Sequence, residues 1–453
     1  MALGVIRVAL AITVFLLVLP ALAQSGGLTY SRVNPQGPQP SGRIDAPIAC
    51  DAPGRRLLMF GGQDSAARND LWAFSLDRQD WTELNPPGAR PPARFGHTAT
   101  FDPVRRRLVI FGGQDSGFFS DVWAYDIIRN TWQLLSPDEA GPSRRYGHSA
   151  IYEAARDRLV ISHGFTTSGR FDDTWAFSLA TNTWQNLSPA GTRPLKRCLH
   201  HAVYDERNGQ MLLYGGCASG FGPCPLDDLW SFDLSANRWT QRTGTPQPPP
   251  RQWYGLAFDG LPQRLILFGG LGNGGALDDT WEYDPSANAW AQRSPGGERP
   301  AARSRHQATF VADLGAMVFF GGRTTAGLTN ELWVLAATPG ARPTITAPAG
   351  GSRLGLAPPS ATPFTWTGVA GALRYGVEHT GAGGQFANPN GTGPDPVNGY
   401  GGAGGGFAVD GTSLSITLSP ATPPGAYQIR VIGLSATGEA VGSFSDALTV
   451  VVQ

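Results

Sequence analysis

One arginine returns at intervals of 51 to 54 residues through most of this 453-residue chain. A guanidinium group matches the geometry of carboxylate and sulfate groups, so arginines gathered at one mouth could bind an anion such as a uronic acid. Each arginine could instead pair with an acid of its own repeat, for example Asp121, Asp173 or Asp228, and repetition in every unit favours this structural role. The six recurring positions are Arg43, Arg94, Arg145, Arg197, Arg251 and Arg303.

Further cations and aromatic residues stand close to these arginines in the sequence. Arg144 precedes Arg145 and Lys196 precedes Arg197, which doubles the positive charge at two of the six positions. Aromatic residues also occur in the variable connecting segments, where exposed rings could stack on sugars or on a partner protein. The candidate aromatic contacts are Phe118, Phe119, Phe171 and Phe221.

The arginine belongs to a longer repeated pattern, which has to be interpreted as a unit. It contains the arginine, a Gly-Gly pair, an acid two residues before a tryptophan, and in most copies a second tryptophan nine residues later. Six copies keep this order, although His163 replaces the first glycine in the third copy. In the second copy the members are Arg94, Gly112-Gly113, Asp121, Trp123 and Trp132.

Each copy predicts four short strands and no helix. The continuous apolar run at 108–111 is typical of a strand buried on both faces. Further short strands are expected at 97–101, 122–125 and 132–135, and glycine permits the backbone turns between them. The pattern resembles the kelch motif, and this resemblance implies a six-bladed β-propeller with four strands in each blade.

The start of the propeller is expected to complete its end. Residues 30–43 match residues 81–94 position by position, with Tyr30 on Trp81, so the chain should begin with a fourth strand. The sixth copy lacks that strand. We therefore expect an all-β fold, in which an N-terminal strand closes the six-bladed kelch propeller and a β-sandwich follows it.

The chain divides into three expected segments. Residues 1–23 have the short apolar region and the Ala-x-Ala site of a signal peptide, with cleavage near Ala23–Gln24. Residues 24–338 should form the propeller. Residues 339–453 have alternating strands that resemble a fibronectin type III or immunoglobulin-like domain. These features predict a secreted or periplasmic protein without a membrane span.

Charge and histidine distribution exclude several functions. Removal of residues 1–23, which contain one arginine, leaves 34 basic and 35 acidic residues and so a formal charge of −1. Without a basic excess we expect no nucleic-acid partner. Because the histidines mostly recur at one position of each repeat, we expect no metal and no cofactor. A monomer is expected.

Cysteine positions predict one disulfide in the fourth repeat. Cys217 and Cys224 lie in one connecting segment, and their pairing is the disulfide we expect. If Tyr204 faces Met211 across a hairpin, Cys198 faces Cys217, so a bridge between these two also fits. Both pairings remain open at this stage.

Two classes of function fit the sequence. The first is an exported, non-catalytic module that binds an extracellular protein or an acidic glycan through the loops at the arginine end. The second is an extracellular carbohydrate-active enzyme, because the two-domain arrangement resembles galactose oxidase and the six blades resemble bacterial sialic-acid mutarotases. The copper ligand set of the oxidases has no full match here. The residues left as candidates are Cys198, Tyr146, Tyr254, His200 and His379.

Overall fold

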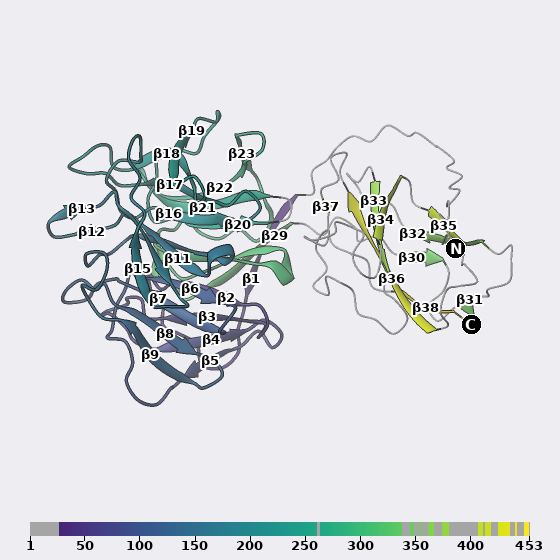
Figure 1. The fold of residues 1–453 in the computed structure, drawn as a ribbon, viewed down its shortest axis with the longest axis horizontal. Helices are drawn as coiled ribbons and strands as arrows, with labels where there is room; N and C mark the ends of the chain where they lie inside the picture. Colours follow the sequence, from purple (N-terminus) through teal and green to yellow (C-terminus); the bar gives the residue numbers. More distant parts are fainter. Residues whose placement is uncertain are drawn as a thin grey trace, which may run out of the picture. The chain divides into compact units, whose positions relative to one another are not determined.

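The computed structural model describes residues 27–260 and 263–337, and beyond these the backbone of the strands between Ile345 and Val452. Contacts divide the chain into two compact units, and Gly27–Thr338 forms one of them. The described part of this unit is almost entirely β, with two short 3₁₀ turns, η1 (Ala154–Arg156) and η2 (Ala312–Leu314). The predicted all-β class and the six-bladed propeller are confirmed (Figure 1).

Six sheets form the blades, and five of them are antiparallel and consist of four strands in sequence order. Blade one contains β2 (Ile48–Asp51), β3 (Arg56–Phe60), β4 (Leu71–Ser75) and β5 (Trp81–Leu84). Blade two contains β6 (Thr98–Asp102), β7 (Arg107–Phe111), β8 (Val122–Asp126) and β9 (Thr131–Ser136). Blade three contains β10 (Ser149–Glu153), β11 (Arg158–Ser162), β14 (Thr174–Ser178) and β15 (Thr183–Asn186). Blade four contains β16 (His201–Asp205), β17 (Gln210–Gly216), β18 (Leu226–Asp233) and β19 (Arg238–Arg242). Blade five contains β20 (Gly255–Asp259), β21 (Arg264–Gly272), β22 (Gly275–Asp284) and β23 (Ala289–Arg293).

The sixth blade combines the two ends of the unit. Strand β1 (Leu28–Val33) pairs antiparallel with β29 (Leu332–Ala337), and Tyr30 lies opposite Leu335. The sheet has the order β24-β1-β29-β26-β25, so the first strand of the unit lies beside the last. The remaining strands of this blade are β25 (Gln307–Val311), β26 (Ala316–Phe320) and the short edge strand β24 (Gly296–Gly297).

The second strand of each blade is the most deeply buried. In β7, every residue after Arg107 is buried, as expected for a strand covered on both faces. Gly112 and Gly113 follow with φ of 66° and 94°. A Cβ on Gly113 would lie 2.9 Å from the carbonyl oxygen of Phe95, so both backbone conformation and space require glycine here.

Aromatic rings join neighbouring blades. The ring of Trp132 packs edge-on against Phe60 of the preceding blade, with ring centroids 5.0 Å apart. Trp81 of blade one makes the same contact with Phe320 of blade six, at 5.3 Å. Each such ring removes a large apolar area from water, which accounts for the second tryptophan of the repeat.

The other unit contains strands in two sheets. One sheet has the order β30-β32-β35, and the other has the order β31-β38-β36-β33-β34, with β37 paired to β36. Sandwich packing of residues 339–453 remains a prediction, and residues 1–23 lie outside the described residues. The strands are β30 (Ile345–Ala347), β31 (Arg353–Leu354), β32 (Ala361–Trp366), β33 (Arg374–His379), β34 (Gly406–Asp410), β35 (Ser413–Thr417), β36 (Gly425–Leu434), β37 (Ala440–Val441) and β38 (Leu448–Val452).

Candidate functional site

The recurring arginine is the centre of a hydrogen-bond network that includes four members of the repeated pattern. Arg94 Nη1 and Nη2 donate to the two carboxylate oxygens of Asp121 at 2.6 and 2.9 Å. Arg94 Nη1 also donates to the carbonyl of Gly112 at 3.0 Å, and Nε donates to the carbonyl of Pro92 at 3.2 Å. The indole of Trp123 donates to the same Asp121 carboxylate at 2.8 Å. The arginine, glycine, acid and first tryptophan of the pattern thus form one structural unit.

Four of the other arginines are bound in the same way, each to an acid of its own blade, and Arg303 reaches Glu331 through a single contact, from Nη2 to Oε2 at 2.6 Å. All six arginine side chains are at most 2% exposed. In each blade the acid occupies the face that an anion would need, so this geometry favours the structural role of the arginines over a ring of anion-binding cations. The five further pairs are Arg43–Asp70, Arg145–Asp173, Arg197–Asp228, Arg251–Asp279 and Arg303–Glu331.

Three other candidate residues are also engaged within the protein. The ring of Phe119 lies 4.2 Å from the guanidinium carbon of Arg94, and the ring of Phe171 lies 4.3 Å from that of Arg145. Each of these two rings therefore covers one buried arginine–aspartate pair. Arg144 is half exposed and pairs with Asp138 at 3.3 Å within its own loop.

The remaining candidates meet at the surface over blades two to four. The rings of Phe118 and Phe165 lie 5.9 Å apart, although they come from neighbouring blades. Phe165 belongs to a hairpin of β12 (Phe165–Thr166) and β13 (Gly169–Arg170), which projects beyond the blade sheets in Figure 1. The guanidinium carbon of Arg170 lies 5.4 Å from the Phe165 ring centroid, within cation–π range.

The patch continues onto the loop between β17 and β18. The ammonium of Lys196 lies 5.2 Å from the ring centroid of Phe221, which is 49% exposed. Leu195 is 44% exposed and approaches the same loop closely at Gly222. We call this surface the aromatic loop patch, and it consists of Phe118, Phe165, Arg170, Leu195, Lys196 and Phe221.

A disulfide holds this loop in shape. Cys217 and Cys224 are bonded, with their Cα atoms 4.3 Å apart, which confirms the expected pair. Cys198 does face Cys217 across the hairpin, as the register predicted, but it takes no part in the bond. Arg170 donates to the carbonyl of Cys217 at 3.0 Å, so the β12–β13 hairpin is tied to the disulfide loop. Cross-linked loops lose less entropy on binding.

The patch combines positive charge with apolar surface. Within residues 27–260 and 263–337, neither Arg170 nor Lys196 forms an ion pair with an acid. Nearby Arg193 does have such a partner, Asp172, at 2.9 Å. Two cations without acidic partners, beside the exposed Phe221 and Leu195 and the half-buried Phe165, form a surface suited to an acidic, partly apolar partner.

The residues that were candidate copper ligands of an oxidase are distributed over both units of the chain. Tyr146 donates to Asp45 at 3.2 Å, and the Tyr254 hydroxyl accepts from the backbone amide of His201 at 3.0 Å. His200 is buried between blades, and desolvation lowers its pKa well below the usual range. His379 lies in β33 of the other unit. Among the described residues, no group of three or more His, Cys, Asp or Glu side chains could hold a metal ion.

Comparisons with known proteins agree with the class of fold. The sheets, their order and the repeated arginine network define a kelch-type β-propeller. A family model described as "KLHDC2/KLHL20/DRC7 Kelch-repeats domain" matches residues 47–252 and 208–341. The chain therefore belongs to this family of kelch-repeat domains.

Curated relatives match part of the chain. Putative adagio-like protein 2 of Oryza sativa subsp. japonica is 29% identical over 313 residues, which cover 63% of this chain and 47% of that protein. Host cell factor of Drosophila melanogaster is 26% identical over 262 residues, 53% of this chain and 17% of that protein. Rab9 effector protein with kelch motifs of Xenopus laevis is 26% identical over 200 residues, 42% of this chain and 53% of that protein. The chain thus spans about half, or less, of the length of these relatives.

In the part of the chain that the structure describes, no helix is long and apolar enough to cross a membrane.

Proposed function

We propose that the propeller is a protein-interaction module and that the aromatic loop patch is its contact surface. The observation that carries this proposal is that Lys196 lies over the exposed Phe221 ring and Arg170 over the half-buried Phe165 ring, while neither cation has an acidic partner among the described residues. Rings and arginine are enriched at the centres of protein interfaces, whereas singly exposed apolar residues are common everywhere. A kelch relative whose name describes it as a Rab9 effector agrees with a role in binding proteins.

The partner in this proposal is a protein segment that carries carboxylates next to apolar side chains. Carboxylates would meet Arg170 and Lys196, and apolar side chains would cover Phe221 and Leu195. Because charges on an open surface are screened within about 8 Å at physiological salt, the affinity should fall as salt rises. An acidic glycan would share only the first of these contacts.

Peptides displayed from a random library, selected on the mature chain, test the proposal. We expect enriched peptides to contain Asp or Glu beside aromatic or aliphatic residues. Lys196→Glu and Phe221→Asp should each weaken binding of a synthetic enriched peptide by roughly 10-fold, since both contacts lie in the patch. Val104→Asp is the control, because Val104 is 67% exposed in the turn between β6 and β7, away from the patch.

Three results would contradict the proposal. Enriched peptides without acidic residues would remove the charge complementarity on which it rests. Equal binding by Phe221→Asp and Val104→Asp would place the contact elsewhere. Binding of acidic glycans, but of no peptide, would favour the glycan partner instead.

Export and ring closure are also part of the proposed function. We propose that residues 1–23 direct the chain to the periplasm or outside the cell, where the disulfide of Cys217 and Cys224 is stable. We further propose that β1 closes the propeller, which agrees with its pairing to β29. The mature N-terminus, read by mass spectrometry of the exported protein, should begin near Gln24.

A further inference from the structure

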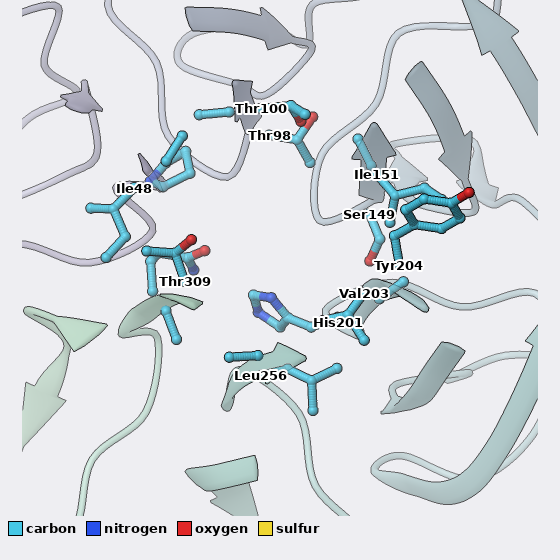
Figure 2. Close-up of a pocket in the computed structure, with 18 of the residues that line it drawn as sticks. Ile48, Thr98, Thr100, Ser149, Ile151, His201, Val203, Tyr204, Leu256 and Thr309 are labelled. Atoms are coloured by element: carbon cyan, nitrogen blue, oxygen red, sulfur yellow. The ribbon is translucent and has the colours of Figure 1, made fainter. Parts of the chain in front are cut away.

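A cavity of about 580 Å³ lies on the axis of the propeller. The innermost strands of the six blades surround it, namely β2, β6, β10, β16, β20 and β25. Figure 2 shows side chains from these strands arranged around an open centre. The volume falls within the range of small-molecule sites in proteins.

The cavity is narrowed at the end where the recurring arginines lie. In each blade, the residue two positions after the arginine donates its backbone N–H to the carbonyl of the equivalent residue in the preceding blade, at 2.8 to 3.2 Å. All six residues have positive φ. The six links form a continuous ring around the axis, through Asp45, Gly96, Gly147, Leu199, Trp253 and Arg305.

Side chains fill the centre of this ring. Arg305 pairs with Asp45, and Tyr146 donates to the same carboxylate at 3.2 Å. The ring of Tyr146 lies over Gly96, where a Cβ would come within 2.0 Å of it. Trp253 lies beneath the Arg305 guanidinium at 5.1 Å. Asp45 is only 3% exposed beneath these side chains, which obstruct this end of the cavity.

Access is therefore from the opposite end. There the turns between first and second strands surround the opening, and Pro103 and Glu206 at its rim are exposed. Among the described residues that line the cavity, Glu206 and the paired Asp45 are the acids, and no lysine or arginine lines it. The interior is consequently close to uncharged.

The walls carry hydrogen-bonding groups that remain available. Thr100, His201, Gln307 and Thr309 line the cavity, and their side chains form no hydrogen bond to another of the described residues. Figure 2 shows the His201 imidazole projecting toward the centre. Burial lowers the pKa of His201 to about 4, so at neutral pH the ring is uncharged and can both donate and accept.

An aromatic collar stands between these groups and the opening. It occupies one equivalent position in five of the six innermost strands, and each ring is half-buried between blades. Aromatic faces pack favourably on the C–H surfaces of sugar rings, while hydroxyl and amide groups bind their oxygens. The collar consists of Phe101, Tyr152, Tyr204, Phe258 and Phe310.

We propose that this axial cavity binds a small uncharged molecule with several hydroxyl groups and an apolar ring face, of which a neutral monosaccharide is the simplest case. A charged ligand would lose its hydration in a cavity that offers no opposite charge, which is costly. A purely apolar ligand would leave the four polar wall groups without partners. This site is separate from the aromatic loop patch, so either could exist without the other.

Titration calorimetry with the mature chain tests the site. The probes are glucose, galactose, mannose and N-acetylglucosamine, compared with glucuronate and glucosamine as charged analogues and indole as an apolar one. We expect saturable binding of at least one neutral sugar, and no saturable binding of the charged analogues. His201→Phe, which keeps the ring volume, and Thr309→Val, which keeps the shape, should each weaken that binding about 10-fold.

Two controls separate the cavity from other surfaces. Thr240→Val makes the same chemical change on the outer strand β19, where Thr240 is exposed, and should leave sugar binding unchanged. Phe221→Asp should also leave it unchanged. The proposal is overturned if none of the four neutral sugars binds, if the charged analogues bind as well as the neutral sugar, or if His201→Phe and Thr309→Val, with unchanged melting temperatures, bind as tightly as the original chain.

Discussion

Asp45 and Arg305 are 260 positions apart in the sequence, yet Arg305 Nε donates to Asp45 Oδ2 at 3.0 Å. The two residues occupy the same place in blades one and six, so the pair spans the junction where the ring of blades begins and ends. Burial works against the charge of Arg305, but the Asp45 carboxylate outweighs this and raises the pKa of the guanidinium. The junction therefore depends on an ion pair as well as on strand pairing and apolar contact.

Removal of Arg305 should destabilise the propeller. Arg305→Ala leaves the buried Asp45 carboxylate without its cation, and an unpaired buried charge of this kind costs about 3–5 kcal/mol. Arg129→Ala is the matched control, because Arg129 pairs with Asp126 at the surface and is 79% exposed. Chemical denaturation should show a large loss for Arg305→Ala and little change for the control. Equal midpoints for both variants would mean that the buried pair contributes nothing to the junction.

The first strand should contribute stability through Tyr30. This side chain is 2% exposed, packs against Phe268 with ring centroids 5.5 Å apart, and is hydrogen-bonded to Thr280 at 2.5 Å. Tyr30→Ala should cost about 3–5 kcal/mol in the free energy of unfolding, whereas the exposed Ser31→Ala should cost little. Deletion of residues 24–33 should lower the melting temperature further and expose a sheet edge. An unchanged melting temperature after the deletion would contradict closure by β1.

Buried histidines should make the propeller sensitive to acid. Desolvation lowers the pKa of His148 and of His163 to about 3, while an unfolded histidine titrates near 6.5. Between these values the unfolded chain binds more protons, so stability is complete above about pH 6.5 and is lost as the pH falls toward 3. Each such histidine contributes up to about 1.4 kcal/mol per pH unit.

Denaturation midpoints between pH 7.5 and 4.5 measure this effect. His148→Tyr is an informative variant, since Tyr254 occupies the equivalent position in blade five. The variant should reduce the pH slope by about one proton, whatever its effect on stability at pH 7. A stability that does not change over this pH range would show that these histidines titrate normally in the folded protein.

Two cations, Arg145 of blade three and Lys196 of blade four, should have different roles, one in stability and the other in binding. Arg145 is fully buried against Asp173, so Arg145→Ala should lower stability by about 3–5 kcal/mol and leave peptide affinity per folded molecule unchanged. Lys196→Ala should weaken peptide binding and leave stability unchanged, because the Lys196 ammonium lies over an exposed ring. Thermal melting and calorimetry on the same samples separate the two effects. Lost affinity in a stable Arg145→Ala would restore the anion-binding interpretation of the arginines.

Much of the blade could be predicted because its signals are local. The apolar run at 108–111 became β7, and the assumed pairing of Tyr204 with Met211 is present, so Cys198 does face Cys217. Similarly, the match of Tyr30 to Trp81 indicated a strand at the start of the propeller, and β1 occupies that place. The spacing of apolar residues along a strand is a property of a short segment, so it can be recognised in the sequence alone.

Other features depend on contacts that no local pattern encodes. The direction of each arginine is decided by an acid 27 to 31 residues away, such as Asp121 for Arg94. The choice of Cys224 over Cys198 depends on the shape of one loop. The axial cavity could not be predicted because the residues at one position of its wall differ in type from blade to blade. Thr100 and Thr309, for example, occupy a position that holds aliphatic residues in the other blades. His201 lies outside the recurring histidine position, so the repeat pattern did not connect it with the cavity.

Hydrogen exchange of the mature chain, with and without an enriched acidic peptide, tests the central claim most directly. If the aromatic loop patch is the protein-binding surface, the peptide should slow exchange at residues 114–120, 165–171 and 217–225, and leave the turns at 103–106 and 205–209 unchanged. Protection confined to those turns, or to the outer strands, would contradict the account.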